Sequence, residues 1–392
     1  MDWQEESVMM RRIFGSAAIT LVAASSQSMH DGFLQRRKAE LLPIPFSPSR
    51  HPGKDGCYYL QDQRVAGDLP DYHKNTIEVE WNRRGWTFQE NMASQCLLYF
   101  GPAMTHYRCQ MEIRAENTRR VSKPADFGLS WSFDLKSRGV DVWSEVVEHY
   151  SGRRLTYMSD KLIALSSLAH DMKEKINGNY LAGIWKEELV WGLLWECFTI
   201  GMKIRYSYIA PSRCKIYRAP SWSWAAGDGA VEWVPRWKPE YFREEVAIID
   251  AKTAAVEGNS LGAVTDGILI LAGKLRHIQP ATARIWLDDG GSGPGDLYRE
   301  FSGISYSMES LDWSSPPDVV NSINKEGIWL LLLATYQRHI GDGKCSSGLL
   351  LSPANDKEKS IRTFRRVGIF RFKQPSGVPI FQDCLNENVA II

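Results

Sequence analysis

A carboxylate in the first quarter of the chain is the side chain best placed for chemistry. Residues 83–90 read Arg-Arg-Gly-Trp-Thr-Phe-Gln-Glu, and an apolar run over 96–100 follows. The pattern predicts a short helix over 87–93 and a buried strand over 96–100, which puts Glu90 on a helix that leads into a sheet. Glu90 could stabilise positive charge on a substrate, or it could satisfy a helix end or pair with one of the two arginines.

Three other groups of residues could carry chemistry, and each has a simpler structural explanation. Cys109 and His106 could form a nucleophile and its base, but residues three apart on a strand point to opposite faces. His30 and Asp31 precede a glycine, and a polar turn explains them better than acid–base catalysis. Ser221 lacks the Gly-x-Ser-x-Gly elbow of a hydrolase.

Motifs for metals and cofactors are missing from the sequence. The seven cysteines are odd in number and include no Cys-x-x-Cys pair, which argues for reduced thiols and against a zinc site or a secreted disulfide framework. There is no Walker-type loop and no Gly-x-Gly-x-x-Gly, and we expect the glycine-rich residues 290–295 to form a flexible loop. We therefore expect neither a metal nor a bound cofactor. No metal-ligand spacing is found among the histidines considered, which are His51, His73, His106, His149 and His170.

Composition narrows the classes of partner. The 47 basic and 46 acidic residues leave a net charge of +1, so a nucleic-acid groove or a membrane-binding surface is not expected. No uncharged apolar run reaches the roughly 18 residues that span a bilayer, and the acidic N-terminus lacks the pattern of a signal peptide. These features predict a cytoplasmic protein. The 15 tryptophans cluster in the central third, where we expect core or interface anchors.

Periodicity predicts three regions: a partial α/β region over residues 1–115, a helical region over 116–215 and a β-rich region over 216–392. In the first region we expect a helix through Met10 and Phe14, a strand over 18–24, an irregular excursion over 39–75 and a second strand over 105–109.

The two later regions are predicted in less detail. Apolar spacing predicts helices throughout 140–198, with Ser159 and Asp160 capping one of them and with Trp185, Leu189 and Leu193 on one face of another. Strands are predicted in the last region over 267–275, 328–336, 348–352 and 367–372.

Several of these segments resemble the fungal heterokaryon-incompatibility (HET) domain. The resemblance begins with residues 2–7, 13–14, 18–26 and 32–34 and continues with 84–90 and 99–101. Residues 155–156, 160–162, 180–185, 192–195 and 219–224 resemble the tail that follows such domains. The first strands of the family would precede Asp2, so we expect this chain to begin inside the domain. The motif residues are Trp3, Arg84, Gly85, Trp86, Gln89 and Gly101.

The resemblance implies a function in fungal non-self recognition and regulated cell death. It implies protein partners, and an open sheet edge would favour self-association. HET domains are also similar to TIR domains, flavodoxin-like folds of which some cleave NAD. By that similarity Glu90 is a candidate catalytic residue that would bind ribose hydroxyls and stabilise an oxocarbenium-like centre as nicotinamide leaves, with NAD as substrate. The alternatives are therefore an enzyme that uses Glu90 and an interaction module without chemistry of its own.

Overall fold

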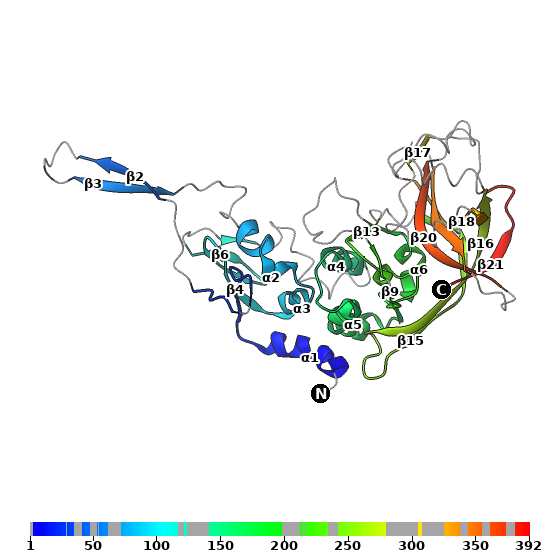
Figure 1. Cartoon of the computed structure of the whole chain (residues 1–392), viewed down its shortest axis with the longest axis horizontal. Coiled ribbons are helices and arrows are strands. Elements are labelled where there is room, and N and C mark those ends of the chain that lie inside the picture. Colours follow the sequence, from blue (N-terminus) through cyan, green and yellow to red (C-terminus); the bar gives the residue numbers. More distant parts are fainter. Residues whose placement is uncertain are drawn as a thin grey trace. The chain divides into compact units, whose positions relative to one another are not determined.

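The computed structural model consists of two compact units. One unit comprises Met9–Asp134, and the other comprises Met1–Val8 with Leu135–Ile392. The boundary between them falls inside α1 (Trp3–Ser16), and each unit is described here by itself (Figure 1). The structure describes residues 3–28, 30–34, 41–47, 53, 55–61, 72–116, 121–123, 141–197, 212–214, 216–233, 242–279, 305–307, 325–337, 344–354, 361–373 and 381–392.

The first unit contains a five-stranded sheet in the order β1-β4-β5-β6-β7. β1 and β4 are parallel, and the remaining neighbours are antiparallel. The predicted helix near the N-terminus and the predicted strands over 96–100 and 105–109 are confirmed, and the strand predicted over 18–24 is shorter. The bounds are β1 (Thr20–Val22), β4 (Cys96–Phe100), β5 (Thr105–Cys109), β6 (Ile113–Ala115) and β7 (Val121–Ser122).

Short helices precede β4 in this unit. They are the π-helix η1 (His73–Ile77), α2 (Glu80–Arg83) and α3 (Trp86–Ala93). Buried Val22, Leu97 and Tyr99 of the parallel strands form a core cluster with Val79, and the half-buried Trp81 of α2 packs against it. Because Val22, Leu97 and Tyr99 all face that cluster, one face of the parallel pair is packed beneath the segment that carries α2.

The prediction of an irregular excursion over 39–75 is wrong in the part that the structure describes. β2 (Leu41–Phe46) and β3 (Gly56–Gln61) form an antiparallel hairpin. Pro43 and Pro45 had argued against a strand, since proline cannot donate to a ladder. They are two residues apart, so both nitrogens can face the outer edge of β2, where no donor is needed.

The second unit opens with two helices, but the prediction of helices throughout 140–198 is wrong. α4 (Asp141–Ser151) and α5 (Ile163–Ile176) confirm the first part. The predicted cap is also wrong, because Ser159 and Asp160 lie inside the short helix η4 (Met158–Lys161) and Leu162 caps α5 without a side-chain bond.

The remainder of that segment changes direction too often to form one helix. β8 (Tyr180–Leu181) and β9 (Ile184–Trp185) form a tight hairpin whose turn residues, Ala182 and Gly183, have φ of 46° and 99°. Trp185, Leu189 and Leu193 therefore do not share one helix face. Short elements follow: η5 (Lys186–Glu188), α6 (Leu189–Gly192), β10 (Trp195–Cys197), β11 (Ser212–Arg213), η6 (Trp224–Ala226), β12 (Gly227–Asp228) and β13 (Val231–Trp233).

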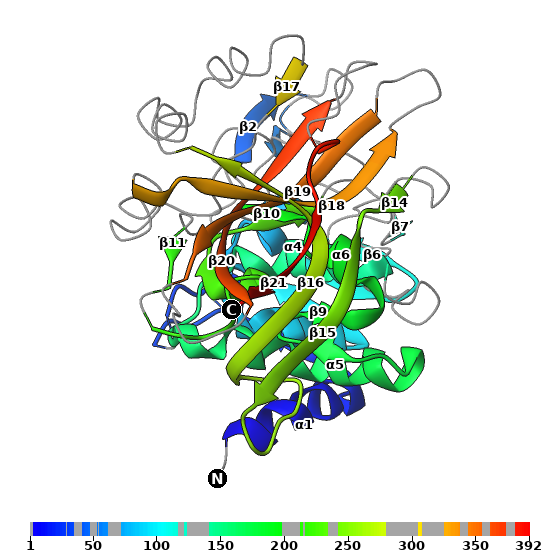
Figure 2. The same ribbon diagram turned by 90° about the vertical axis from the view of Figure 1, so that its right-hand side faces the viewer.

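The C-terminal part of this unit is a barrel-like sheet (Figure 2). β16 pairs with both β18 and β21, and the ladders β18–β19, β19–β20 and β20–β21 complete a closed ring. The four predicted strands are confirmed, whereas β15 and β21 were not predicted. The bounds are β14 (Phe242–Glu244), β15 (Val246–Ala255), β16 (Val264–Ile278), β17 (Ser305–Ser307), β18 (Ile328–Gln337), β19 (Lys344–Pro353), β20 (Arg362–Lys373) and β21 (Asn386–Ile391).

Two arginines of β20 join the barrel to the segment around β10. Arg366 is fully buried and donates to the carbonyl oxygens of Leu193 at 2.6 Å and Trp195 at 2.5 Å. Its guanidinium carbon lies 3.4 Å from the centroid of the Trp195 ring. Arg371 forms a buried ion pair with Glu196 at 2.5 Å. The structure confirms the prediction of a mixed α/β fold with a β-rich C-terminal part. The boundaries at residues 115 and 215 stay predictions.

Candidate functional site

Glu90 lies on α3, as predicted, and its side chain is partly buried. Burial raises the pKa of its carboxyl group above the ordinary value, and the nearby charge of Arg84 opposes that rise. Within the described residues the Glu90 side chain makes no hydrogen bond or ion pair. Of the two arginines considered as partners, Arg83 forms an ion pair with Glu80 at 3.3 Å, and Arg84 acts on Glu90 through its charge.

The end of α3 shows where Glu90 stands relative to the sheet. Ser94, which caps α3, donates its hydroxyl to the Glu90 carbonyl at 2.8 Å and lies 2.7 Å from the Thr20 hydroxyl. Thr20 is the first residue of β1, and Cys96 is the first residue of β4. One helical turn therefore separates Glu90 from the amino ends of the two parallel strands. Ligands of open α/β sheets usually bind at the opposite, carboxyl ends.

The other motif residues around Glu90 have positions that the structure fixes. Arg84 is exposed and ends α2, and Gly85 is buried with φ of −63°, a value that any residue adopts. Trp86 is only partly buried, whereas Phe88 and Gln89 are fully buried, so Phe88 is the larger core anchor of this helix. The first motif residue, Trp3, begins α1, and its side chain lies outside the described part.

Gly101, the last motif residue, has a clear packing role. The Asn75 side chain accepts hydrogen bonds from the backbone of Ala103 at 2.8 Å and Met104 at 3.1 Å, which closes the turn between β4 and β5. A Cβ atom on Gly101 would lie 2.5 Å from the Cβ and Oδ1 of Asn75. Glycine is required because the amide occupies the space where a side chain would begin.

A buried polar network beneath α3 was not predicted. Arg108 of β5 is 2% exposed and donates to the Asn91 carbonyl at 2.9 Å and to its Oδ1 at 2.6 Å. Asn91 in turn donates to the Tyr99 hydroxyl at 3.1 Å. An arginine in register with the buried face of a strand is the signal in the sequence that could have indicated this network. These bonds anchor α3 to the sheet.

At the three other candidate positions, which are His30 with Asp31, His106 with Cys109, and Ser221, the geometry favours a structural role over catalysis. Asp31 accepts hydrogen bonds from the backbone of Gln27 at 3.1 Å and Ser28 at 2.9 Å, as expected of a polar turn. On β5 buried and partly exposed residues alternate, so His106 and Cys109 face opposite sides as predicted.

Ser221, near the start of the third predicted region, forms side-chain hydrogen bonds with backbone groups. Its hydroxyl donates to the Ile392 carbonyl and accepts from the Arg366 backbone at 2.9 Å. A hydroxyl held in this way joins two strands of the barrel and is not presented as a nucleophile. Among the described residues no group of three or more His, Cys, Asp or Glu side chains is placed to hold a metal ion.

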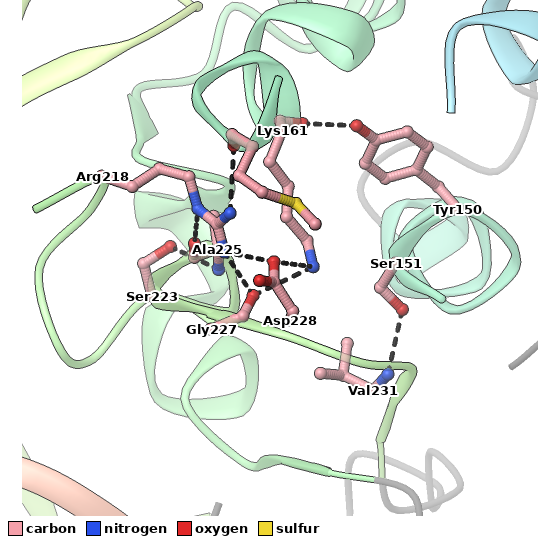
Figure 3. A network of polar contacts seen from close by, with 10 residues as sticks. Tyr150, Ser151, Lys161, Arg218, Ser223, Ala225, Gly227, Asp228 and Val231 are labelled. Atoms are coloured by element: carbon pink, nitrogen blue, oxygen red, sulfur yellow. Dashed lines mark hydrogen bonds and ion pairs between the residues drawn. The ribbon is translucent and has the colours of Figure 1, made fainter. Parts of the chain in front are cut away.

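A second buried charge cluster joins two motifs of the tail segment (Figure 3). Arg218 donates to the Ala225 carbonyl at 2.6 Å, to the Gly227 carbonyl at 2.6 Å and to Asp228 at 2.8 Å. Lys161 donates to the same Gly227 carbonyl at 2.9 Å and lies 3.7 Å from Asp228. Burial, and then repulsion by Arg218, lower the pKa of Lys161 to about 7, and attraction to Asp228 opposes this.

The tryptophans of the tail motifs bond to the backbone. The indole nitrogens of Trp143 and Trp224 both donate to the Gly183 carbonyl, at 2.8 Å and 2.9 Å. Trp195 donates to the Trp222 carbonyl at 3.0 Å. These bonds bring segments 180–185, 192–195 and 219–224 into one core, in agreement with the expectation that the tryptophans are anchors.

Comparison with known proteins identifies the N-terminal part of the chain. No curated protein and no solved structure is significantly similar to this chain. No helix in the described residues is long and apolar enough to cross a membrane. Residues 1–90 match the family model described as heterokaryon incompatibility protein (HET). That stretch contains α1, β1 and α3 as far as Glu90, so the resemblance predicted from the sequence is confirmed over residues 1–90.

Proposed function

We propose that this protein is a cytoplasmic interaction module of fungal heterokaryon incompatibility that passes non-self recognition on to regulated cell death. The match of residues 1–90 to the HET family supports the general function. The position of Glu90 supports a module without its own chemistry, because its backbone carbonyl is linked through Ser94 to Thr20, at the amino end of β1, whereas ligands of open α/β sheets usually bind at the carboxyl ends. The partners would be proteins, including a second copy of the chain, and not nucleic acid.

The second candidate function is an NAD-cleaving enzyme that uses Glu90. The environment of Glu90 favours it. The side chain is partly buried, the pKa of its carboxyl group is raised, and it has no partner among the described residues. The helix α3 leading into β4, and β4 pairing in parallel with β1, are also consistent with a flavodoxin-like or TIR-like sheet. In this alternative the carboxylate would bind the ribose of NAD, which is the substrate and not a resident cofactor.

Substitution of Glu90 separates the two functions. Glu90→Gln keeps the shape of the side chain and removes a charge whose burial is unfavourable, so the variant should fold. Killing in a fungal host and loss of cellular NAD are measured for wild type, Glu90→Gln and the exposed control Glu78→Gln, with protein levels matched.

The interaction module predicts equal killing by all three proteins and no NAD loss that depends on Glu90. Loss of killing and of NAD turnover in Glu90→Gln alone, with its melting temperature unchanged, would overturn the module and support the enzyme. Loss of killing without any change in NAD would place Glu90 in a binding surface.

A further inference from the structure

Two cysteine thiols lie opposite each other on the sheet of the first unit. Cys96 is the first residue of β4 and Cys109 is the last residue of β5, and the antiparallel register pairs them directly. Both are free thiols, and both are partly exposed. In the strand ladders that the structure describes, no other cysteine has a cysteine as its partner.

The backbone hydrogen bonds show which kind of pair the two residues form. The Cys109 N–H donates to the Glu112 carbonyl at 2.9 Å, and the Thr105 carbonyl accepts from the Glu116 N–H at 3.0 Å. These groups of β5 therefore point toward β6 and away from β4. Because this direction alternates along a strand, Cys109 forms a non-hydrogen-bonded pair with the residue opposite it on β4.

A pair of this kind has the spacing that a disulfide needs. The Cα atoms of a non-hydrogen-bonded antiparallel pair are about 4.5 Å apart, and the side chains are closer together than in a hydrogen-bonded pair. Disulfides join residues whose Cα atoms are roughly 4.4 to 6.8 Å apart. Cys96 and Cys109 can thus be joined without a change in the register of the two strands.

One tyrosine hydroxyl contacts both thiols, which shows that their side chains converge. Tyr107 lies two residues before Cys109, on the same face of β5. Its hydroxyl oxygen is 3.3 Å from the sulfur atom of Cys96. Hydrogen bonds to Cys96 and to Cys109, with a smaller effect of burial, raise the pKa of Tyr107 above its ordinary value. Both sulfur atoms are therefore within hydrogen-bond reach of a single oxygen atom.

The two thiols lie on the face of the sheet that is turned away from the core cluster. Leu97 and Tyr99 of β4 belong to that cluster and alternate with the partly exposed residues of the strand, which include Cys96. The residues after Cys109 are exposed, and Met111 is 80% exposed. A dissolved thiol or disulfide can therefore reach this face.

We propose that Cys96 and Cys109 are a modification site, at which the protein forms a reversible disulfide by exchange with a low-molecular-weight disulfide such as glutathione disulfide. One protein thiolate attacks a sulfur atom of glutathione disulfide, forms a mixed disulfide and releases one glutathione. The second protein thiolate attacks the protein sulfur of that mixed disulfide and releases the second glutathione. The two protein thiols lose two electrons and two protons, and the disulfide that accepts them becomes two thiols.

The exposure of the pair makes the bond reversible. Exposed disulfides are the labile ones, whereas structural disulfides resist reduction by glutathione. The hydroxyl of Tyr107 would lose its thiol partners on oxidation and regain them on reduction. The inference goes beyond the proposed function and does not depend on it, since exchange is measured on the purified protein whatever the killing assay gives.

Peptide mapping of protein equilibrated with glutathione tests the proposal. The purified protein is incubated with increasing glutathione disulfide at a fixed concentration of reduced glutathione, its free thiols are blocked with N-ethylmaleimide, and it is digested with trypsin. Cleavage after Arg84, Arg108 and Arg114 leaves Cys96 in peptide 85–108 and Cys109 in peptide 109–114, each as its only cysteine. The mass of the two linked peptides therefore identifies this disulfide alone.

We expect the linked peptides at a glutathione disulfide concentration at least about tenfold below the one that modifies the exposed Cys57, because the second exchange is intramolecular. Additional reduced glutathione should restore both thiols. On a non-reducing gel the linked protein should still migrate as a monomer.

Substitution of one cysteine at a time separates the two steps. Cys109→Ser should stop the exchange at the mixed disulfide, so Cys96 should accumulate bound glutathione, and Cys96→Ser should do the same at Cys109. The matched control Cys57→Ser removes an exposed cysteine of β3 and should leave the linked peptides unchanged. If a variant does not fold, the peptide map of the wild type still decides the proposal.

Three results would overturn the proposal. Absence of the linked peptides while Cys57 carries glutathione would show that the two thiols do not react as a pair. Links from Cys96 or Cys109 to other cysteines, or a dimer on the gel, would assign these thiols to a different bond. Linked peptides that persist in an excess of reduced glutathione would make the bond a fixed structural disulfide.

Discussion

The buried lysine of the tail segment makes stability depend on pH in a defined direction. Lys161 is 2% exposed, and two cations, Lys161 and Arg218, share one carboxylate, Asp228. The pKa of Lys161 falls from 10.5 to about 7 in the folded protein. At about 1.4 kcal/mol for each pH unit, the fall corresponds to roughly 5 kcal/mol of unfavourable free energy when Lys161 is charged.

The sign of the effect follows from proton binding. Below pH 7 Lys161 is protonated in both states, and the folded state carries the full cost. Between pH 7 and 10.5 the unfolded chain binds one proton more than the folded protein, so stability rises with pH. Above pH 10.5 the lysine is neutral in both states, and this cost disappears.

Lys161→Met removes this dependence. Asp228 keeps its 2.8 Å contact with Arg218, and the Gly227 carbonyl keeps its bond from Arg218, so no buried group loses its last partner. The free energy of unfolding of the variant minus that of wild type should fall by roughly 2 kcal/mol between pH 7 and pH 9. Methionine has a similar length and no charge, so the variant should be at least as stable as wild type at pH 6.

Urea unfolding at four pH values from 6 to 9, followed by tryptophan fluorescence, measures this difference. The exposed Lys173→Met on α5 is the matched control and should show a constant difference near zero. Arg218→Met removes four contacts and should lower stability by about 3 to 5 kcal/mol at pH 9, where Lys161 is neutral in the folded protein. A constant difference between Lys161→Met and wild type across this range would refute the account of Lys161.

Two further predictions concern packing. Gly101→Ala forces a Cβ against Asn75 and should lower the free energy of unfolding by about 1 to 3 kcal/mol. The control Gly32→Ala has open space around the new atom and should change that free energy by less than about 0.5 kcal/mol. The melting temperatures of the two variants test this prediction. Arg366→Leu leaves two backbone carbonyls without their donor and should lower the urea midpoint by the equivalent of about 3 kcal/mol or more. Arg365→Leu changes an exposed neighbour and is the control. An equal effect of the two substitutions would contradict the prediction.

The parts of the fold that could be predicted are those with a local pattern. Residues 96–100 match β4 because a short apolar run is typical of a buried strand, and residues 105–109 match β5 as its hairpin partner. The helix with Glu90 was also placed correctly, since glycine and tryptophan precede a short amphipathic run. In the barrel, β18 was recognised from its run of leucines.

The other elements depend on contacts between distant residues. The β8–β9 turn has a non-glycine residue at φ 46°, and nothing in the apolar spacing of that segment distinguishes it from a helix. Asn75 and Gly101 are far apart in sequence, so the reason for that glycine emerges only when the chain is folded. The same holds for Arg366, whose partners precede it by more than 170 residues.

The tail motifs show why a recognisable sequence pattern need not mark a site of chemistry. Gly183 has φ of 99°, and its carbonyl accepts the indole protons of Trp143 and Trp224. A side chain on Gly183 would meet the Trp224 nitrogen at 2.5 Å, so the glycine and the tryptophan each need the other. Such residues are fixed by the fold, whatever the protein binds. Recognition therefore has to come from side chains outside these contacts.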